Sequence, residues 1–147
     1  MAYATESDLD TKWGSDQVTL AAVDPTTGLR SETRVAASLA DASAQMDGYF
    51  AKRYTLPIDA APNGVILLRN LCCDLAMGNL AVMPGARNEI VKTANEQAIR
   101  FLERVGSGSA DIPQNPPPSG PAGVLSPNEA IVEDDPRMFD RHRLRAL

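Results

Sequence analysis

Residues 31–53 have the sequence SETRVAASLADASAQMDGYFAKR, and the spacing of their apolar side chains indicates a helical fold. These side chains recur at steps of three and four residues: Val35, Leu39, Ala42, Met46, Tyr49 and Phe50. That period places them on one face of an α-helix, with polar residues on the remaining surface. A proline disfavours helical backbone in the residue before it, so Leu56-Pro57 marks the end of this element.

Two more helices are predicted after this one. Residues 63–82 are apolar over much of the helix circumference, which predicts the central and most buried helix. The apolar residues of this stretch are Val65, Ile66, Leu67, Leu68, Leu71, Cys72, Leu75 and Leu80. Residues 87–105 repeat the amphipathic pattern, and Gly106 is expected to form the C-cap. The apolar face of this last helix consists of Val91, Ala94, Ala98, Phe101, Leu102 and Val105.

The N-terminal residues predict one short helix. Thr5 followed by Asp8 resembles a capping box, and Leu9 and Trp13 follow at helical spacing before Gly14. Residues 15–30 are ambiguous, because Asp-Pro and Thr-Gly turn signals interrupt them and their apolar residues fit either a turn or a strand-like segment. We therefore predict an all-α protein whose residues 1–106 form a small bundle of four helices.

The C-terminal part differs in composition. Residues 107–136 are rich in Pro, Gly and Ser and are expected to form a disordered linker, which spans roughly 30 Å as a coil and roughly 100 Å when stretched. Residues 137–147, RMFDRHRLRAL, combine apolar and basic side chains. We expect this peptide to bind a partner protein through Arg137, Met138, Phe139, Arg141, Arg143, Leu144 and Leu147.

Charge and hydropathy exclude several classes of protein. A net charge of −5 argues against a body that wraps nucleic acid, because binding phosphates requires a basic face. Apolar runs stay shorter than the roughly 18 residues that span a bilayer, and the acidic N-terminus lacks a signal-peptide core. The expectation is a soluble protein made in the cytoplasm.

The sequence predicts neither a catalytic residue, nor a metal site, nor a cofactor. Cys72 and Cys73 are adjacent, and neighbouring helical residues point about 100° apart, so a disulfide between them would be strained and both are expected to pack in the core. The single histidine, His142, lies far away in the C-terminal peptide without a suitable nucleophile beside it. Gly106–Ser109 lacks the strand and lysine of a phosphate-binding loop.

Several short motifs carry a resemblance. The first is Tyr3-Ala4-Thr5 followed by Asp8-Leu9, and the second lies within LADASAQMDGYFAKRYTLP at residues 39–57. The second motif comprises Asp41, Ala42, Ser43, Asp47, Gly48, Tyr49, Arg53, Tyr54, Leu56 and Pro57. LLRNLCCDLAMGNL, ANEQAIRFLERVGSG and the closing Phe139, Arg141 and Leu144 complete the match. In this combination the chain resembles a conserved family of Mu-like phages and prophages over about residues 1–108 and the last ten.

That family is similar in size and helix order to the head–tail connector proteins of long-tailed phages. The resemblance implies a ring, commonly of twelve copies, that lies below the portal protein in the neck of the virion. It also implies contact with the next neck or tail protein, a stopper or tail terminator, while DNA passes through the lumen without sequence-specific binding. The linker of residues 109–136 is longer than this family leads one to expect.

Two groups of residues within the body have alternative interpretations. Asp47, Arg53 and Tyr54 form either a contact between ring subunits or a structural junction at the helix end. Asp74 lies in the most apolar helix, so its carboxylate must be either exposed or paired, with Arg69 or Arg53 as the candidate partners.

A structural head–tail connector is the favoured hypothesis, with the C-terminal peptide docking on the portal or on an adjacent subunit. A single peptide binds weakly because ordering it costs more than its apolar burial returns, so either strand addition or repetition round a ring must help. The alternatives are a helical interaction or DNA-binding regulatory module of a prophage, and an enzyme subunit. The first requires a basic recognition helix, and none of the four helices is clearly basic.

Overall fold

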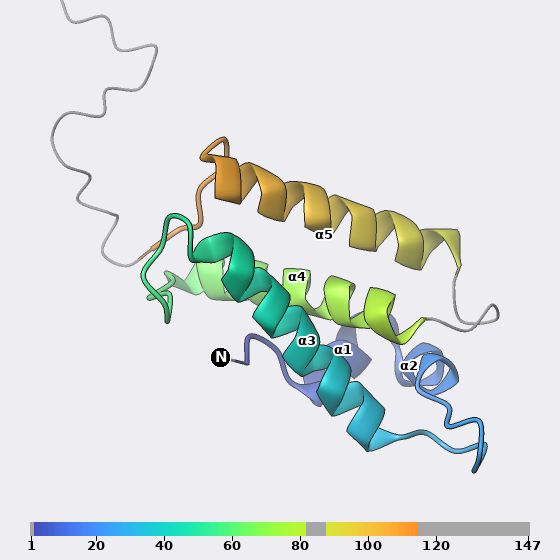
Figure 1. The fold of residues 1–147 in the computed structure, drawn as a ribbon. Coiled ribbons are helices and arrows are strands. Elements are labelled where there is room, and N and C mark those ends of the chain that lie inside the picture. Colours follow the sequence, from blue (N-terminus) through green and yellow to red (C-terminus); the bar gives the residue numbers. More distant parts are fainter. Residues whose placement is uncertain (1, 82–87, 115–147) are drawn as a thin grey trace, which may run out of the picture. The chain divides into compact units, whose positions relative to one another are not determined.

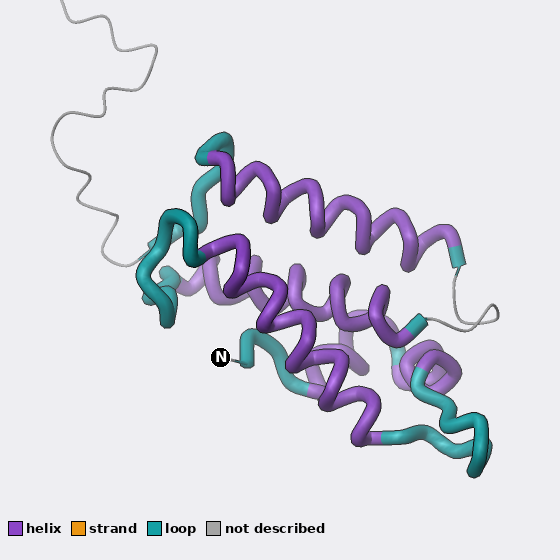
Figure 2. Tube along the Cα trace, in the orientation of Figure 1, coloured by secondary structure: helices purple, strands orange, loops and turns teal. Residues whose placement is uncertain are grey.

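The computed structural model describes residues 2–81 and 88–114, and these residues belong to one compact unit. They form five helices, labelled in Figure 1: α1 (Glu6–Trp13), α2 (Ser15–Ala21), α3 (Glu32–Phe50), α4 (Pro62–Leu80) and α5 (Glu89–Ser107). Figure 2 shows helices joined by loops throughout the described residues. Two isolated β-bridges pair Val23 with Arg30 and Ala60 with Gln114. The all-α fold class is confirmed.

The first helix begins as its sequence predicts. The Thr5 hydroxyl accepts a hydrogen bond from the Asp8 backbone N–H, and the Asp8 carboxylate accepts one from the Thr5 N–H. This capping box satisfies two backbone donors that a helix start leaves unpaired. Gly14, at φ 84°, ends α1 and directly precedes α2.

The ambiguous segment of residues 15–30 contains a helix that the sequence did not single out. Residues 15–21 form α2, in which Val18 and Ala21 are buried. The turn that follows is closed by a hydrogen bond from the Asp24 N–H to the Leu29 carbonyl. Neither a strand nor a simple turn therefore accounts for this segment. The described residues form three long helices and two short ones, instead of the four helices predicted.

Helix α4 is the central helix, as predicted. It contacts α1, α2, α3 and α5 in turn, and Figure 1 shows it between α5 and the α1–α2 pair. It buries Leu68, Leu71, Cys72, Cys73, Leu75, Ala76, Met77 and Leu80. The apolar stretch is not buried throughout, however, because Val65 and Ile66 in its first turns are 43% and 53% exposed.

Both cysteines lie in the core as free thiols, which confirms their predicted packing role. Burial raises the pKa of the Cys73 thiol to about 12 and also raises the pKa of Cys72. The Ser43 hydroxyl lies 3.5 Å from the Cys72 sulfur, which joins α3 to α4 in the interior. Both thiols therefore stay protonated and protected at neutral pH.

Candidate functional site

The residues of the family-like motifs converge at one end of the bundle. Tyr3, in the N-terminal segment, donates a hydrogen bond of 2.5 Å from its hydroxyl to the Asp47 carboxylate on α3. Burial, followed by this hydrogen bond to Asp47, raises the pKa of Tyr3 far above its ordinary value. Its ring also meets Phe50 edge-on at 6.1 Å. Two motifs that are about forty residues apart in sequence thus form one contact.

Arg53 and Tyr54, just after α3, hold the end of α5. One Arg53 guanidinium nitrogen donates to the carbonyls of Val105 and Ala110 at 3.2 and 3.3 Å and lies 3.0 Å from the Asp111 carboxylate. Val105 belongs to the last turn of α5, and Ala110 lies in the segment that follows the helix. Arg53 therefore binds the end of α5 together with the residues after it.

Tyr54 contacts the residues that follow α5. Its hydroxyl accepts a hydrogen bond of 3.0 Å from the Ile112 N–H and lies 3.3 Å from the Asp111 carboxylate. Its ring packs edge-on against Phe50 at 6.3 Å, and the Arg53 guanidinium lies 5.7 Å from the ring centre. The motif from Phe50 to Tyr54 therefore connects the buried core to residues 111 and 112.

Residues 108–114, which we call the tail root, pack on the bundle. Gly108 adopts φ 86°, a left-handed conformation that glycine accepts without strain, and ends α5 there instead of at Gly106. Ile112 is only 2% exposed, and the Pro113 carbonyl accepts a hydrogen bond from the Ala61 N–H at 2.9 Å. The linker expected from residue 107 does not begin there, because the body extends at least to Gln114.

Asp47, Arg53 and Tyr54 all have partners within their own chain. Their sequence-predicted role as a contact between ring subunits stays a prediction, and the geometry matches the structural alternative. The expected partner-binding residues of the C-terminal peptide lie outside the described residues, as do the rest of the linker and His142.

The partner of Asp74 is a residue that the sequence did not suggest. Its carboxylate lies 2.7 Å from the Lys12 ammonium on α1, which also donates to the Asn70 carbonyl at 2.9 Å. The proposed partners of Asp74 were wrong, because Arg69 pairs with Asp8 and Arg53 with Asp111. Burial raises the pKa of Asp74, while Lys12 and the Trp13 indole act in the opposite direction.

Replacing Lys12 with methionine is expected to lower the free energy of unfolding by about 1 kcal/mol at pH 7, because it leaves the Asp74 carboxylate half-buried and unpaired. The folded protein holds the Asp74 proton more tightly than the unfolded chain does. Stability of the variant therefore rises as the pH falls toward the unfolded value of 3.8, and the gap to the parent protein narrows. Urea unfolding at several pH values between 4 and 8 measures the free energy of unfolding of the variant and of the parent protein.

Arg69→Met is the matched control, since Arg69 is 45% exposed and lies 3.4 Å from Asp8. An exposed pair of this kind contributes less than about 1 kcal/mol. A Lys12→Met variant that loses no more stability than Arg69→Met, at any pH, contradicts the pairing role of Lys12.

Six large apolar side chains of the described residues are exposed, and their elements lie at the two ends of the bundle (Figure 1). We call Leu56, Val65 and Ile66 the α4-start patch. Leu20, Leu29 and Ile90, which are 53%, 71% and 70% exposed, form the α2–α5 patch. Figure 1 shows the start of α4 and the end of α5 at one end, and α2 and the start of α5 at the other. Large apolar side chains grouped on a surface are typical of protein–protein contacts.

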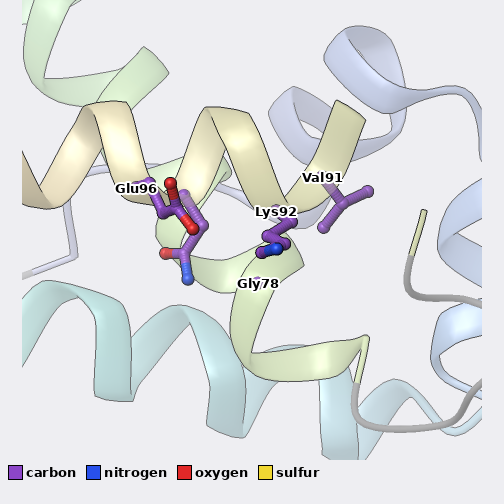
Figure 3. A pocket seen from close by; sticks show the side chains of 5 residues that line it. Gly78, Val91, Lys92 and Glu96 are labelled. Carbon is purple, nitrogen blue, oxygen red and sulfur yellow. The ribbon is translucent and has the colours of Figure 1, made fainter. Parts of the chain in front are cut away.

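A shallow depression between α4 and α5 gives weaker evidence of a binding site. Val91, Lys92, Asn95 and Glu96 line it from α5, with Gly78 below them on α4 (Figure 3). Gly78 permits close packing, because a Cβ atom there would lie 2.5 Å from the Asn95 side chain. The opposite charges of Lys92 and Glu96 favour no single class of ligand.

Within residues 2–81 and 88–114, no cluster of three or more His, Cys, Asp or Glu residues is placed to hold a metal ion. None of the described helices is long and apolar enough to cross a membrane.

The tail root was the main feature that sequence reasoning missed. Its signal was the placement of Ala110 and Ile112, two apolar residues at alternate positions directly after the helix. Alternation in so short a stretch predicts little by itself, and only the surface offered by Tyr54 and Ala61 gives these residues a place to pack.

Comparison with known proteins supports the resemblance to a Mu-like phage family that the sequence motifs suggested. Residues 3–125 match the model of the family described as Bacteriophage Mu, Gp36. The chain is 30% identical over 144 residues to the gene product J of Escherichia phage Mu, covering 96% of each chain. It is 33% identical over 81 residues to the Mu-like prophage FluMu protein gp36 of Haemophilus influenzae, covering 55% of this chain and 54% of that protein. The chain belongs to the Bacteriophage Mu Gp36 family.

Proposed function

We propose that this protein is a non-catalytic head–tail connector of a tailed phage. Copies of the bundle pack side by side into a ring, twelve in the favoured arrangement, in the neck of the virion. The portal protein lies on one side of this ring, and a stopper or tail terminator lies on the other. DNA passes through the lumen without being recognised, and the net charge of −5 of the whole chain disfavours binding to phosphates.

One observation carries this proposal: the tail root is bound to the body by the residues of the family-like motif. Arg53 and Tyr54 contact Val105, Ala110, Asp111 and Ile112. The chain therefore reaches Gln114 at a defined position beside Ala60, at the start of α4. A rigid body with a defined starting point for a long C-terminal segment suits a protein that connects neighbouring components of an assembly.

The exposed surface supports the same function. A ring needs two different, complementary surfaces on each subunit, because every copy contacts the next one in a head-to-tail manner. The α4-start patch and the α2–α5 patch lie at opposite ends of the bundle (Figure 1). Their placement fits contacts that repeat from one copy to the next.

Deletion of residues 137–147 is expected to leave the body folded while reducing the joining of heads to tails by roughly two or more orders of magnitude. The loss is large because repeated weak contacts in a ring bind far more strongly together than singly. Circular dichroism measures the fold, and the yield of infectious particles from a complementation assay measures joining.

A full-length control replaces Phe139 and Leu144 with serine, which keeps the length and charge of the peptide. If apolar burial drives the docking, this variant also loses most of its joining activity. Unchanged particle yields after the deletion would show that the C-terminal peptide has no role in connection.

A further inference from the structure

The tail root is attached to the body by a small number of contacts. Ile112 is the one buried residue among its seven, and the others are half-buried or exposed. The Ala61 N–H donates one backbone hydrogen bond to the Pro113 carbonyl. Burial of a single isoleucine stabilises a segment far less than the whole core stabilises the helices. The tail root is therefore expected to open by itself, while the helices stay folded.

The side chains that hold the tail root differ in how well they are protected from water. Arg53 and Asp111 form an ion pair whose side chains are 35% and 72% exposed, and pairs this accessible contribute little to stability. The Tyr54 hydroxyl accepts a hydrogen bond from the Ile112 N–H at 3.0 Å, next to the buried anchor. Figure 1 shows the tail root, in orange, beside the loop after α3 that carries Tyr54.

Three rings, which we call the aromatic row, connect Tyr54 with the N-terminal segment. The Tyr54 ring meets Phe50 edge-on at 6.3 Å, and Phe50 meets Tyr3 edge-on at 6.1 Å. The backbone follows the same route, because the N–H groups of Arg53 and Tyr54 both donate to the Phe50 carbonyl. Phe50 is fully buried, and in a close-packed interior the removal of one ring is felt by the next.

Tyr3 also ties the N-terminal segment to the end of α3. Its hydroxyl donates to the Asp47 carboxylate at 2.5 Å, about one turn before Phe50. Its backbone N–H donates to the Ser43 hydroxyl at 3.4 Å. The N-terminal segment therefore packs on the same end of α3 from which the aromatic row reaches the tail root.

We propose that Tyr3 controls whether the tail root is bound to the body or released. With Tyr3 in place, the aromatic row holds the Tyr54 hydroxyl where it accepts from Ile112. When residues 2–4 leave α3, Phe50 and Tyr54 lose that support and the tail root opens. The inference deepens the proposed function, on which its use rests, because an open tail root gives the C-terminal segment about 25 Å more reach when stretched.

Amide hydrogen exchange in the full-length protein tests this control. In the parent protein the Ile112 amide is expected to exchange at least about tenfold faster than the amide of Leu75, which lies in the core on α4. Tyr3→Ala is expected to speed exchange at Ile112 by a further factor of about ten. Tyr3→Phe keeps the ring and loses the hydrogen bond to Asp47, so an acceleration of about threefold is expected. This milder variant carries the test if Tyr3→Ala folds poorly.

Lys12→Met is the matched control for loss of global stability. Lys12 bonds Asp74 and the Asn70 carbonyl on α4, and so acts on a different part of the bundle from the aromatic row. This variant is expected to speed exchange at Leu75, which requires unfolding of the helices, and to leave the Ile112 rate within about twofold of the parent value.

Urea unfolding of a double variant shows whether Tyr3 and Ile112 are coupled. The effects of residues that share no contact normally add. If Tyr3 stabilises the tail root, the urea midpoint of the Tyr3→Ala, Ile112→Ala variant falls by less than the sum of the two single shifts, because the tail root is already open in Ile112→Ala. The shifts of Lys12→Met and Ile112→Ala are expected to add.

Each contrary result overturns a stated part of this inference. Equal exchange rates at Ile112 and Leu75 in the parent protein mean that the tail root does not open by itself. An Ile112 rate that neither Tyr3→Ala nor Tyr3→Phe changes means that Tyr3 does not control it. Additive midpoint shifts for Tyr3→Ala and Ile112→Ala exclude the coupling. The connector function is independent of these results, since normal head–tail joining after deletion of residues 137–147 is what contradicts it.

Discussion

Replacing Phe50 with alanine is expected to lower the free energy of unfolding by about 3–5 kcal/mol, as is typical when a fully buried aromatic side chain is truncated. Phe50 is 0% exposed and lies at the end of α3. Its ring meets Tyr3 and Tyr54 edge-on, so it joins the N-terminal segment to the residue that holds the tail root. The cavity that alanine leaves therefore weakens the contacts with Tyr3 and Tyr54 in addition to the core.

Urea unfolding followed by circular dichroism measures this loss, and amide hydrogen exchange at Ile112 reports on the tail root. The matched control is Ile90→Ala, which truncates a side chain that is 70% exposed and is expected to change stability by less than about 0.5 kcal/mol. Equal stabilities of Phe50→Ala and Ile90→Ala are incompatible with the described core.

Replacing Gly64 with alanine is expected to destabilise the protein by about 1–2 kcal/mol, although alanine favours helices. A Cβ atom at this position would lie 2.4 Å from the Pro113 carbonyl oxygen, a backbone atom that cannot move without displacing the tail root. Overpacking of this kind costs about 1–3 kcal/mol, and the helix propensity of alanine returns about 0.5–1 kcal/mol. The hydrogen bond between the Ala61 N–H and the Pro113 carbonyl is the first to weaken.

Gly48→Ala is the control, because Gly48 also lies within a helix but a Cβ atom there would meet no neighbouring atom within 4 Å. This change is expected to stabilise the protein by about 0.5–1 kcal/mol. The two substitutions are chemically identical and are predicted to have opposite signs. If Gly64→Ala stabilises the protein as much as Gly48→Ala does, the tail root does not pack on the start of α4.

Together these variants test whether the family-like motif serves mainly to hold the tail root. Tyr3, Asp47, Arg53 and Tyr54 form their contacts within the chain, and Phe50 lies among them. A motif of this kind stabilises the point from which the C-terminal segment begins. In the proposed ring, we expect the contacts between subunits to involve the exposed apolar residues near the two ends.

The three long helices could be predicted from the sequence because their signals are local. A stripe at steps of three and four residues requires only that one face be buried, and α3 buries Val35, Leu39, Ala42, Met46 and Phe50 as expected. The capping box of Thr5 and Asp8 is equally local, since both partners lie within one turn. The boundaries of the long helices agree to within three residues, close to the spread that is usual for helix ends.

The contacts between distant residues depended on the tertiary structure. Lys12 pairs with Asp74 because α1 crosses α4 beside it, and neither residue type nor spacing distinguishes Lys12 from other cations. Val65 and Ile66 have the composition of core residues but remain exposed, because no neighbouring helix covers that part of α4 among the described residues. Residues 108–114 acquire a fixed position only where Arg53, Tyr54 and Ala61 present donors and an acceptor to them.

Local periodicity alone therefore determined that this protein is a helical bundle with α4 at its centre. Where the C-terminal segment starts, and which apolar residues stay available for partners, was decided only when the helices packed. The physical reason is that helix formation depends on residues one or two turns apart, whereas burial and pairing depend on groups that folding brings together from about fifty residues away.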